Sequence, residues 1–340
     1  MATTNYQNVG TPRFYVDIYS YLQAVGLGGD ADPPFSYGLN PTSQGVSVQP
    51  PIGSDEDYFE DVAHKVFFKY RLNGQIKTSI LQNLTHNKSV IGFLGHNFHS
   101  EGLAADLQIE DSTDTDDGSG LEGIVNWSSP YSTIEQDGFS LYKTTFELQH
   151  FSSFSIGLDQ QNVFSPNFVA KLGSVFLGSY YDMPYSPDLS LKMSIEMDGI
   201  KNLKTKGGAS LTGINYTKPQ NWGDAGAWQL GGASNLRAGR RVWNLSFSYL
   251  SDSDVFPVNA TTSNPSNDYP DDDTLLNGTD FFSQVWNRTM GGHLPFIFQP
   301  DKDNSNPDQF AICRFDMKSL QITQTLGNVY SVNLKIRETW

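Results

Sequence analysis

A strictly alternating segment near the end of the chain constrains the fold more than any other feature. From Tyr330 to Arg337, apolar and polar side chains follow one another at every position. A period of two residues is that of a strand with one buried face. Because a terminal segment usually frays unless a sheet or helix holds it, we expect this strand to lie within a sheet.

The rest of the chain favours the same class of structure. Its 340 residues are 13% aromatic and 17% charged, with 31 Gly and 17 Pro. This mixture favours short strands joined by turns over long surface helices. We therefore predict a mostly β protein with a jelly-roll or β-sandwich domain, then a second β-rich domain, one N-terminal helix and one short helix near the C-terminus.

Changes in pattern along the chain divide it into three regions. Residues 1–57 are predicted to form the N-terminal helix and an extended arm, residues 58–178 the jelly roll, and residues 179–340 the second β-rich domain. The helix is predicted from a spacing of three and four between apolar residues. Those residues are Phe14, Ile18, Tyr21, Leu22 and Val25.

Three segments define the expected core of the last region. Leu189–Glu196 and Arg241–Tyr249 alternate as strands, and Asp280–Arg288 has apolar residues on one helical face before a Gly-Gly pair. In the second strand the side chains expected on the buried face are Trp243, Leu245, Phe247 and Tyr249. The sequence thus predicts a sheet with a short helix packed against it.

The net charge and hydropathy of the chain indicate which kinds of partner to expect. A formal net charge of −15 without clusters of Lys and Arg opposes binding to nucleic acid phosphate. No apolar run approaches the ~18 residues that span a bilayer, and the N-terminus lacks the basic and apolar parts of a secretory signal. We therefore expect neither a nucleic-acid partner nor a membrane span. The single cysteine, Cys313, is expected to be a buried apolar residue.

No group of residues forms a recognisable catalytic, cofactor or metal motif. His96 and His99 are three residues apart, but no further ligands accompany them, so a turn between strands is favoured over a metal site. The acidic segment 111–118 lacks the register of a calcium loop, which favours a solvated loop over a calcium site. We expect no catalytic residue, no metal and no cofactor, and hence no enzyme.

Aromatic and basic residues supply the candidate contact sites. Trp127, Tyr131, Trp222 and Trp228 lie in stretches typical of loops, where they suit either subunit contacts or stacking on sugars. The basic candidates are Arg240, Arg241, Arg314 and Arg337. A guanidinium group binds a carboxylate through two hydrogen bonds, so we expect these arginines to pair with carboxylates of a neighbouring subunit.

Two parts of the chain resemble known proteins. Segments 91–97 and 171–178, with the strands between them, are similar to galactose-binding-like (discoidin-like) jelly rolls, which are often found in phage tail proteins. The C-terminal half resembles virion structural proteins of tailed phages, which are themselves similar to distal-tail and minor-tail proteins. The segments that carry this second resemblance are 181–189, 204–208, 239–243, 251–254, 294–301 and 336–338.

The resemblance implies assembly into the virion, and the lack of a secretory signal predicts synthesis in the host cytoplasm. The leading hypothesis is a structural component of the distal tail or tail tip, working as a homo-oligomeric ring in contact with neighbouring tail tube, hub and tip proteins. A carbohydrate-binding module that recognises a host surface glycan is the alternative from another class. A capsid decoration or head–tail junction protein is a further structural alternative.

Overall fold

The structure is a computed structural model of the 340-residue chain. It describes residues 9–25, 35–37, 47–48, 55–56, 61–62, 65–72, 88–96, 98–100, 103–111, 115–116, 121–125, 135–144, 151–160, 171–172, 174–189, 191–196, 200–214, 240–261, 274–275 and 277–339. The protein is mostly β, as predicted from the sequence.

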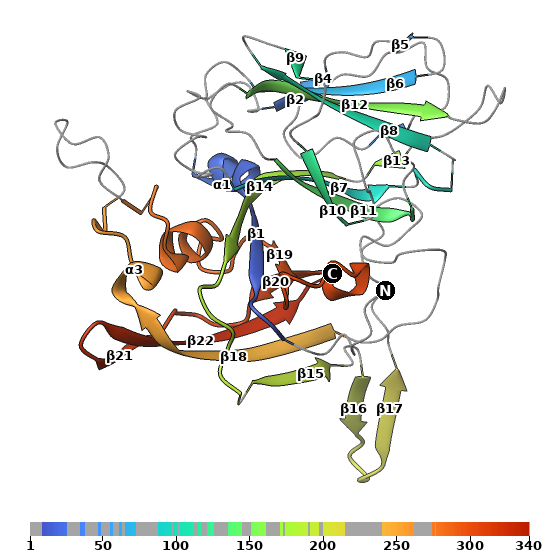
Figure 1. The fold of residues 1–340 in the computed structure, drawn as a ribbon. Helices are drawn as coiled ribbons and strands as arrows, with labels where there is room; N and C mark the ends of the chain where they lie inside the picture. The colour runs from blue at the N-terminus through green and yellow to red at the C-terminus, as the bar shows by residue number, and fades with distance from the viewer. Residues whose placement is uncertain are drawn as a thin grey trace.

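Half of the described strands belong to one antiparallel sheet of eleven strands (Figure 1). Its order is β10-β11-β7-β14-β1-β19-β20-β22-β18-β15, and β21 also pairs with β22. The strands are β1 (Arg13–Asp17), β7 (Ser89–His96), β10 (Leu121–Val125), β11 (Gly138–Thr144), β14 (Ser174–Asp182), β15 (Lys192–Glu196), β18 (Arg240–Ser251), β19 (Phe296–Gln299), β20 (Ala311–Phe315), β21 (Ile322–Leu326) and β22 (Val329–Glu338).

A second sheet of seven strands lies over the β7, β10 and β11 end of the large sheet (Figure 1). It has the order β4-β2-β6-β12-β8-β9, with β5 beside β6. Its strands are β2 (Phe35–Tyr37), β4 (Asp55–Glu56), β5 (Asp61–Val62), β6 (Lys65–Leu72), β8 (Leu103–Asp111), β9 (Thr115–Asp116) and β12 (Phe151–Gln160).

Two separate strand pairs and four short helical segments complete the described elements. β3 (Ser47–Val48) pairs with β13 (Lys171–Leu172), and β16 (Ile200–Lys204) forms a hairpin with β17 (Ser210–Ile214). The helical segments are α1 (Ile18–Ala24), α3 (Asp252–Val255), the π-helix η2 (Phe282–Asn287) and the 3-10 helix η3 (Pro307–Gln309). Within the described residues, no helix is long and apolar enough to cross a bilayer.

The N-terminal segment corrects the helix prediction. Arg13–Asp17 forms the strand β1, and the helix α1 begins only at Ile18. β1 lies between β14 and β19, and both of its faces are buried. A strand buried on both faces has a continuous apolar run instead of an alternating one. The run Phe14, Tyr15 and Val16 therefore gave no two-residue period, and it was misread as part of a helix.

Successive residues of β1 enter two different cores. Phe14 and Val16 pack in a cluster with β18, β19, β22 and η2, whereas Tyr15 packs on the opposite face with residues of β7, β11 and β14. Side chains of a strand point to opposite faces in turn. β1 is thus the element shared by the two cores of the large sheet.

The pairing around β14 also bears on the predicted domain boundary. The boundary between residues 178 and 179 falls inside β14, which pairs with β7 through its first half and with β1 through its second. β1, from the predicted N-terminal arm, lies in the middle of the same sheet. Backbone hydrogen bonds therefore run without interruption from the predicted jelly-roll strands to the C-terminal strands.

The predicted strands and helix of the C-terminal region are present. In β22, Val332, Leu334 and Ile336 are buried, as the alternation indicated. The helix over residues 280–288 is confirmed, and its backbone is that of a π-helix. It ends before Gly291 and Gly292, whose φ angles of 67° and 89° suit glycine.

Tyr249 departs from its predicted burial. The expected strand β18 buries Trp243, Leu245 and Phe247, but Tyr249 is 77% exposed and Leu250 takes the next buried position. The pairing of β18 with β22 shifts register between Phe247 and Leu250. Such a bulge adds one residue to a strand and exchanges the faces of the residues that follow it.

Candidate functional site

The predicted arginine sites have partners within the chain. Arg241 binds Glu338 through both oxygens, with Nε to Oε2 at 3.2 Å and Nη2 to Oε1 at 3.1 Å. Its Nη2 also donates to the carbonyl of Phe310 at 3.0 Å, and its guanidinium lies 5.3 Å from the centre of the Trp243 ring. Glu338 is buried, and the pair connects the start of β18 to the end of β22.

The other arginines lie on β18, β20 and β22. Arg337 on β22 donates from Nε to Glu196 on β15 at 3.0 Å. Arg240 stands opposite Glu196 in the β15–β18 register, and Arg314 is exposed on β20. Arg241 and Arg337 were predicted to bind carboxylates of a neighbouring subunit, and the carboxylates that they bind here belong to the same chain.

The four aromatic candidates, Trp127, Tyr131, Trp222 and Trp228, lie outside the described residues. The same holds for the side chains of the acidic segment 111–118, of which the structure describes only Asp111 in β8 and the short strand β9. The alternatives of subunit contact and sugar binding for these aromatic residues therefore stay predictions.

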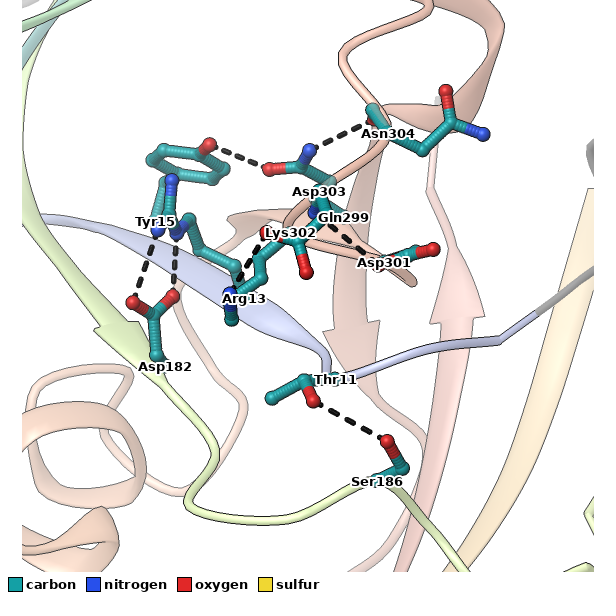
Figure 2. Close-up of polar contacts among 10 residues, drawn as sticks. All are labelled: Thr11, Arg13, Tyr15, Asp182, Ser186, Gln299, Asp301, Lys302, Asp303 and Asn304. Atoms are coloured by element: carbon teal, nitrogen blue, oxygen red, sulfur yellow. Dashed lines mark hydrogen bonds and ion pairs between the residues drawn. The ribbon is translucent and has the colours of Figure 1, made fainter. Parts of the chain in front are cut away.

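Polar contacts around β1 fix its position at the centre of the sheet (Figure 2). Arg13 donates to both carboxylate oxygens of Asp182 on β14, with Nη2 to Oδ2 at 3.0 Å. On the same face of β1, the Tyr15 hydroxyl donates to Oε1 of Gln299 on β19 at 2.7 Å. Burial raises the pKa of Tyr15 far above its usual range, so this hydroxyl stays protonated and acts as a donor.

The cluster of Figure 2 continues into the loop after β19. Gln299 donates from Nε2 to the carbonyl of Asn304 at 2.9 Å, and the backbone N–H of Lys302 donates to the carbonyl of Thr11 at 2.9 Å. These hydrogen bonds join three segments that are distant in sequence. They hold β1 in place, so their role is structural.

A buried arginine was missed by the sequence analysis. Arg288 is 1% exposed and donates from Nη1 to Gln284 Oε1 at 2.7 Å and to Ser179 Oγ at 2.9 Å. Burial lowers its pKa to about 9. The helical period could have revealed it, because Phe281, Val285 and Arg288 recur at steps of four and three and so share the buried face.

His96 is a buried histidine of β7. Its ring stacks on Phe98 with centroids 4.5 Å apart, and Nε2 lies 2.9 Å from Ser140 Oγ on β11. Within the described residues, no group of three or more His, Cys, Asp or Glu side chains could hold a metal ion. The turn predicted for His96 and His99 is found at His99, because residues 98–100 form a turn, whereas His96 itself lies in the strand β7.

The burial of His96 predicts acid sensitivity. Burial lowers the pKa of His96 to about 3, against about 6.5 in an unfolded chain. Below about pH 6.5, His96 is protonated in the unfolded chain but stays neutral in the folded chain. The free energy of unfolding should therefore fall as the pH drops from about 6.5 to about 3. The limiting slope is about 1.4 kcal/mol per pH unit for this one group. Urea unfolding of the wild type and of His96→Gln between pH 7 and pH 4.5 measures it.

The matched control for this prediction is Ser140→Ala. That variant removes the same hydrogen bond but keeps the buried imidazole, so its stability should fall with pH as steeply as that of the wild type. The His96→Gln variant should lose less stability over the same range. Equal slopes for His96→Gln and the wild type would contradict the prediction.

The described surface of the C-terminal region is rich in exposed apolar side chains. All the large exposed apolar residues within the described part of the chain, except Val25, lie at or beyond residue 185. These are Tyr185 (55% exposed), Leu189 (102%), Ile195 (49%), Leu203 (62%), Tyr249 (77%), Phe256 (37%), Val258 (81%), Met290 (43%) and Leu326 (70%). Three of them, Leu189, Ile195 and Leu203, lie in β15 or in the segments on either side of it in the chain.

β15 and the β16–β17 hairpin form the outer margin of this region. Among the described strands, β15 pairs on one side only, with β18. The hairpin follows β15 in the chain and projects away from the sheet (Figure 1). Its described side chains, residues 203–210, are all exposed. We call β15, Leu189 and the hairpin the β15 margin, and we take it as the candidate contact surface.

Comparisons with known proteins add no relative. No protein family model matches the chain, and no curated protein or solved structure matches it either.

Proposed function

We propose that this chain is a structural virion protein of a tailed phage, a component of the distal tail or tail tip that works through contacts between subunits. The observation that carries the proposal is the set of exposed apolar side chains on the C-terminal region. Scattered exposed apolar residues are normal, but large ones gathered at a sheet margin are typical of interaction surfaces. The family resemblance of the same region supports the location in the tail.

The mechanism of such a protein is geometric. The Arg241–Glu338 and Arg13–Asp182 pairs tie distant strands together, so each subunit presents its contact surface on a rigid sheet. The projecting hairpin extends the reach of one subunit toward the next. Apolar residues that water surrounds in one subunit are then buried against its neighbours, which is the favourable term in association.

Association and location test the proposal separately. Sedimentation of the purified chain at physiological salt should show discrete oligomers, and salt matters because subunits with a net charge of −15 repel one another. Labelling of the chain in intact particles, viewed by electron microscopy, should place it at the tail end. A strict monomer that is absent from particles would overturn the proposal.

A further inference from the structure

The β15 margin differs from the other described margins of the large sheet. β15 pairs with β18 through five consecutive residues without a shift in register. β10, at the opposite margin, contains a register shift between Gly123 and Val125, and β21 contains one between Gln324 and Leu326. Bulges discourage further strand pairing, whereas a regular edge strand is a template for it. β15 is thus the margin best suited to accept another strand.

The sequence of β15 is complementary to itself when it is read in the opposite direction. It runs Lys192, Met193, Ser194, Ile195, Glu196. In an antiparallel pair of two copies centred on Ser194, each Lys192 lies opposite Glu196 of the partner subunit, and each Met193 lies opposite Ile195 of the partner subunit. Directly opposed charges of opposite sign and directly opposed apolar residues both stabilise a strand pair.

Exposure of the side chains agrees with this pairing. Lys192 and Ser194 are exposed, Ile195 is 49% exposed, and Met193 is partly buried against the core. Ile195 lies on the core face of the sheet, beside the edge of β15 that no described strand pairs with. A second strand would cover it with Met193 of the partner subunit and extend the apolar face beyond β15.

The same register gives a neighbour to one further exposed residue. Leu189, which is 102% exposed, lies in the turn just before β15, and the hairpin after β15 begins at Ile200. Antiparallel pairing brings the segment before β15 in one copy beside the segment after β15 in the other. Each Leu189 would therefore approach the base of the partner subunit's hairpin.

We propose that two copies of this chain associate about a two-fold axis through Ser194, with their β15 strands paired antiparallel, so that the two large sheets become one continuous sheet. The inference deepens the proposed function and rests on it for the premise that copies of the chain meet. A two-fold contact is self-complementary and cannot alone close a ring of more than two subunits. It joins a subunit of one ring to a subunit of another.

A single cysteine placed on the axis tests the register. Opposed Cα atoms of an antiparallel pair lie about 4.5 to 5.5 Å apart, within the range of about 4.4 to 6.8 Å that a disulfide spans. Ser194→Cys should therefore give a covalent dimer as the main species under mild oxidation. The wild type is the negative control and should form no disulfide dimer, because its one cysteine, Cys313, is buried.

Lys192→Cys is the matched control. In the proposed register the two residues 192 are four positions apart along the strands, which is about 14 Å. This variant, at another exposed position of the same strand, should stay monomeric on a denaturing gel. Covalent dimers of both variants, or of neither, overturn the pairing. Oligomers of the wild type without a Ser194→Cys dimer would leave the assembly function standing and remove only this interface.

Charge exchange gives an independent test. Lys192→Glu places like charges opposite each other at both ends of the strand pair, and so does Glu196→Lys, which also removes the acceptor of Arg337 in the same chain. Each variant alone should therefore lose the two-fold contact in sedimentation. An equimolar mixture of the two variants restores opposite charges at both ends and should recover the dimer. Failure of the mixture to recover it, with both variants folded by circular dichroism, contradicts the proposal.

Discussion

Gly178→Ala should destabilise the protein by about 3 to 5 kcal/mol, an effect at the upper end for a single substitution. Gly178 lies in β14 opposite Asp17 of β1. A Cβ atom at this position would lie 1.8 Å from the carbonyl oxygen of Val16 and 2.8 Å from its carbonyl carbon. Both are backbone atoms of a strand that is held on its other side by β19, so the clash is relieved only by moving β1.

Urea or thermal unfolding measures the loss in Gly178→Ala, and Gly207→Ala is its control. At Gly207, in the turn of the exposed hairpin, the nearest atom to an added Cβ is Thr205 Oγ1 at 3.9 Å. That substitution should change the stability by less than about 1 kcal/mol. A Gly178→Ala protein as stable as Gly207→Ala would show that β1 and β14 do not approach as closely as the structure describes.

Phe14→Ala should cost about 3 to 5 kcal/mol, as expected when a large aromatic side chain is removed from a core. The Phe14 ring is fully buried, and its centre lies 5.3 to 5.6 Å from those of three other phenylalanines. These are Phe281 next to η2 and Phe296 and Phe298 in β19. The cavity left by alanine would loosen the contact of β1 with the helix and with β19 together.

Tyr249→Ala is the control for Phe14→Ala because it removes an aromatic side chain that is 77% exposed on β18. Its unfolding free energy should stay within about 0.5 kcal/mol of the wild type. Phe14→Leu keeps most of the apolar volume and should lie between the wild type and Phe14→Ala. Equal losses for Phe14→Ala and Tyr249→Ala would contradict the central position of β1.

The strands that the sequence predicted well are those with one buried face. β22 and most of β18 show their burial in the alternation of apolar and polar residues, because one side of the C-terminal sheet faces water. β1 was misread since both of its faces are buried. Tyr249 was misplaced because a bulge depends on the pairing of two strands, which the pattern of either strand alone does not contain.

The sequence identified contact arginines but not their partners, and it did not identify the β15 margin. Arg241 and Arg337 were identified from their type and position, but Glu338 and Glu196 become their neighbours only through the register of β15, β18 and β22. β15 likewise lies at the edge of the large sheet because of the order of the strands, and that order is set by contacts between distant segments. Periodicity along one strand cannot reveal which strand stands at a margin.

The central place of β1 has a consequence for synthesis on the ribosome. The Tyr15 hydroxyl meets a glutamine 284 residues further along the chain. At about 5 to 20 residues per second, roughly 15 to 60 seconds of translation separate the emergence of these two partners. For that time the nascent N-terminal strand has no β19 to join, and its apolar residues are available to chaperones or to other unfinished chains.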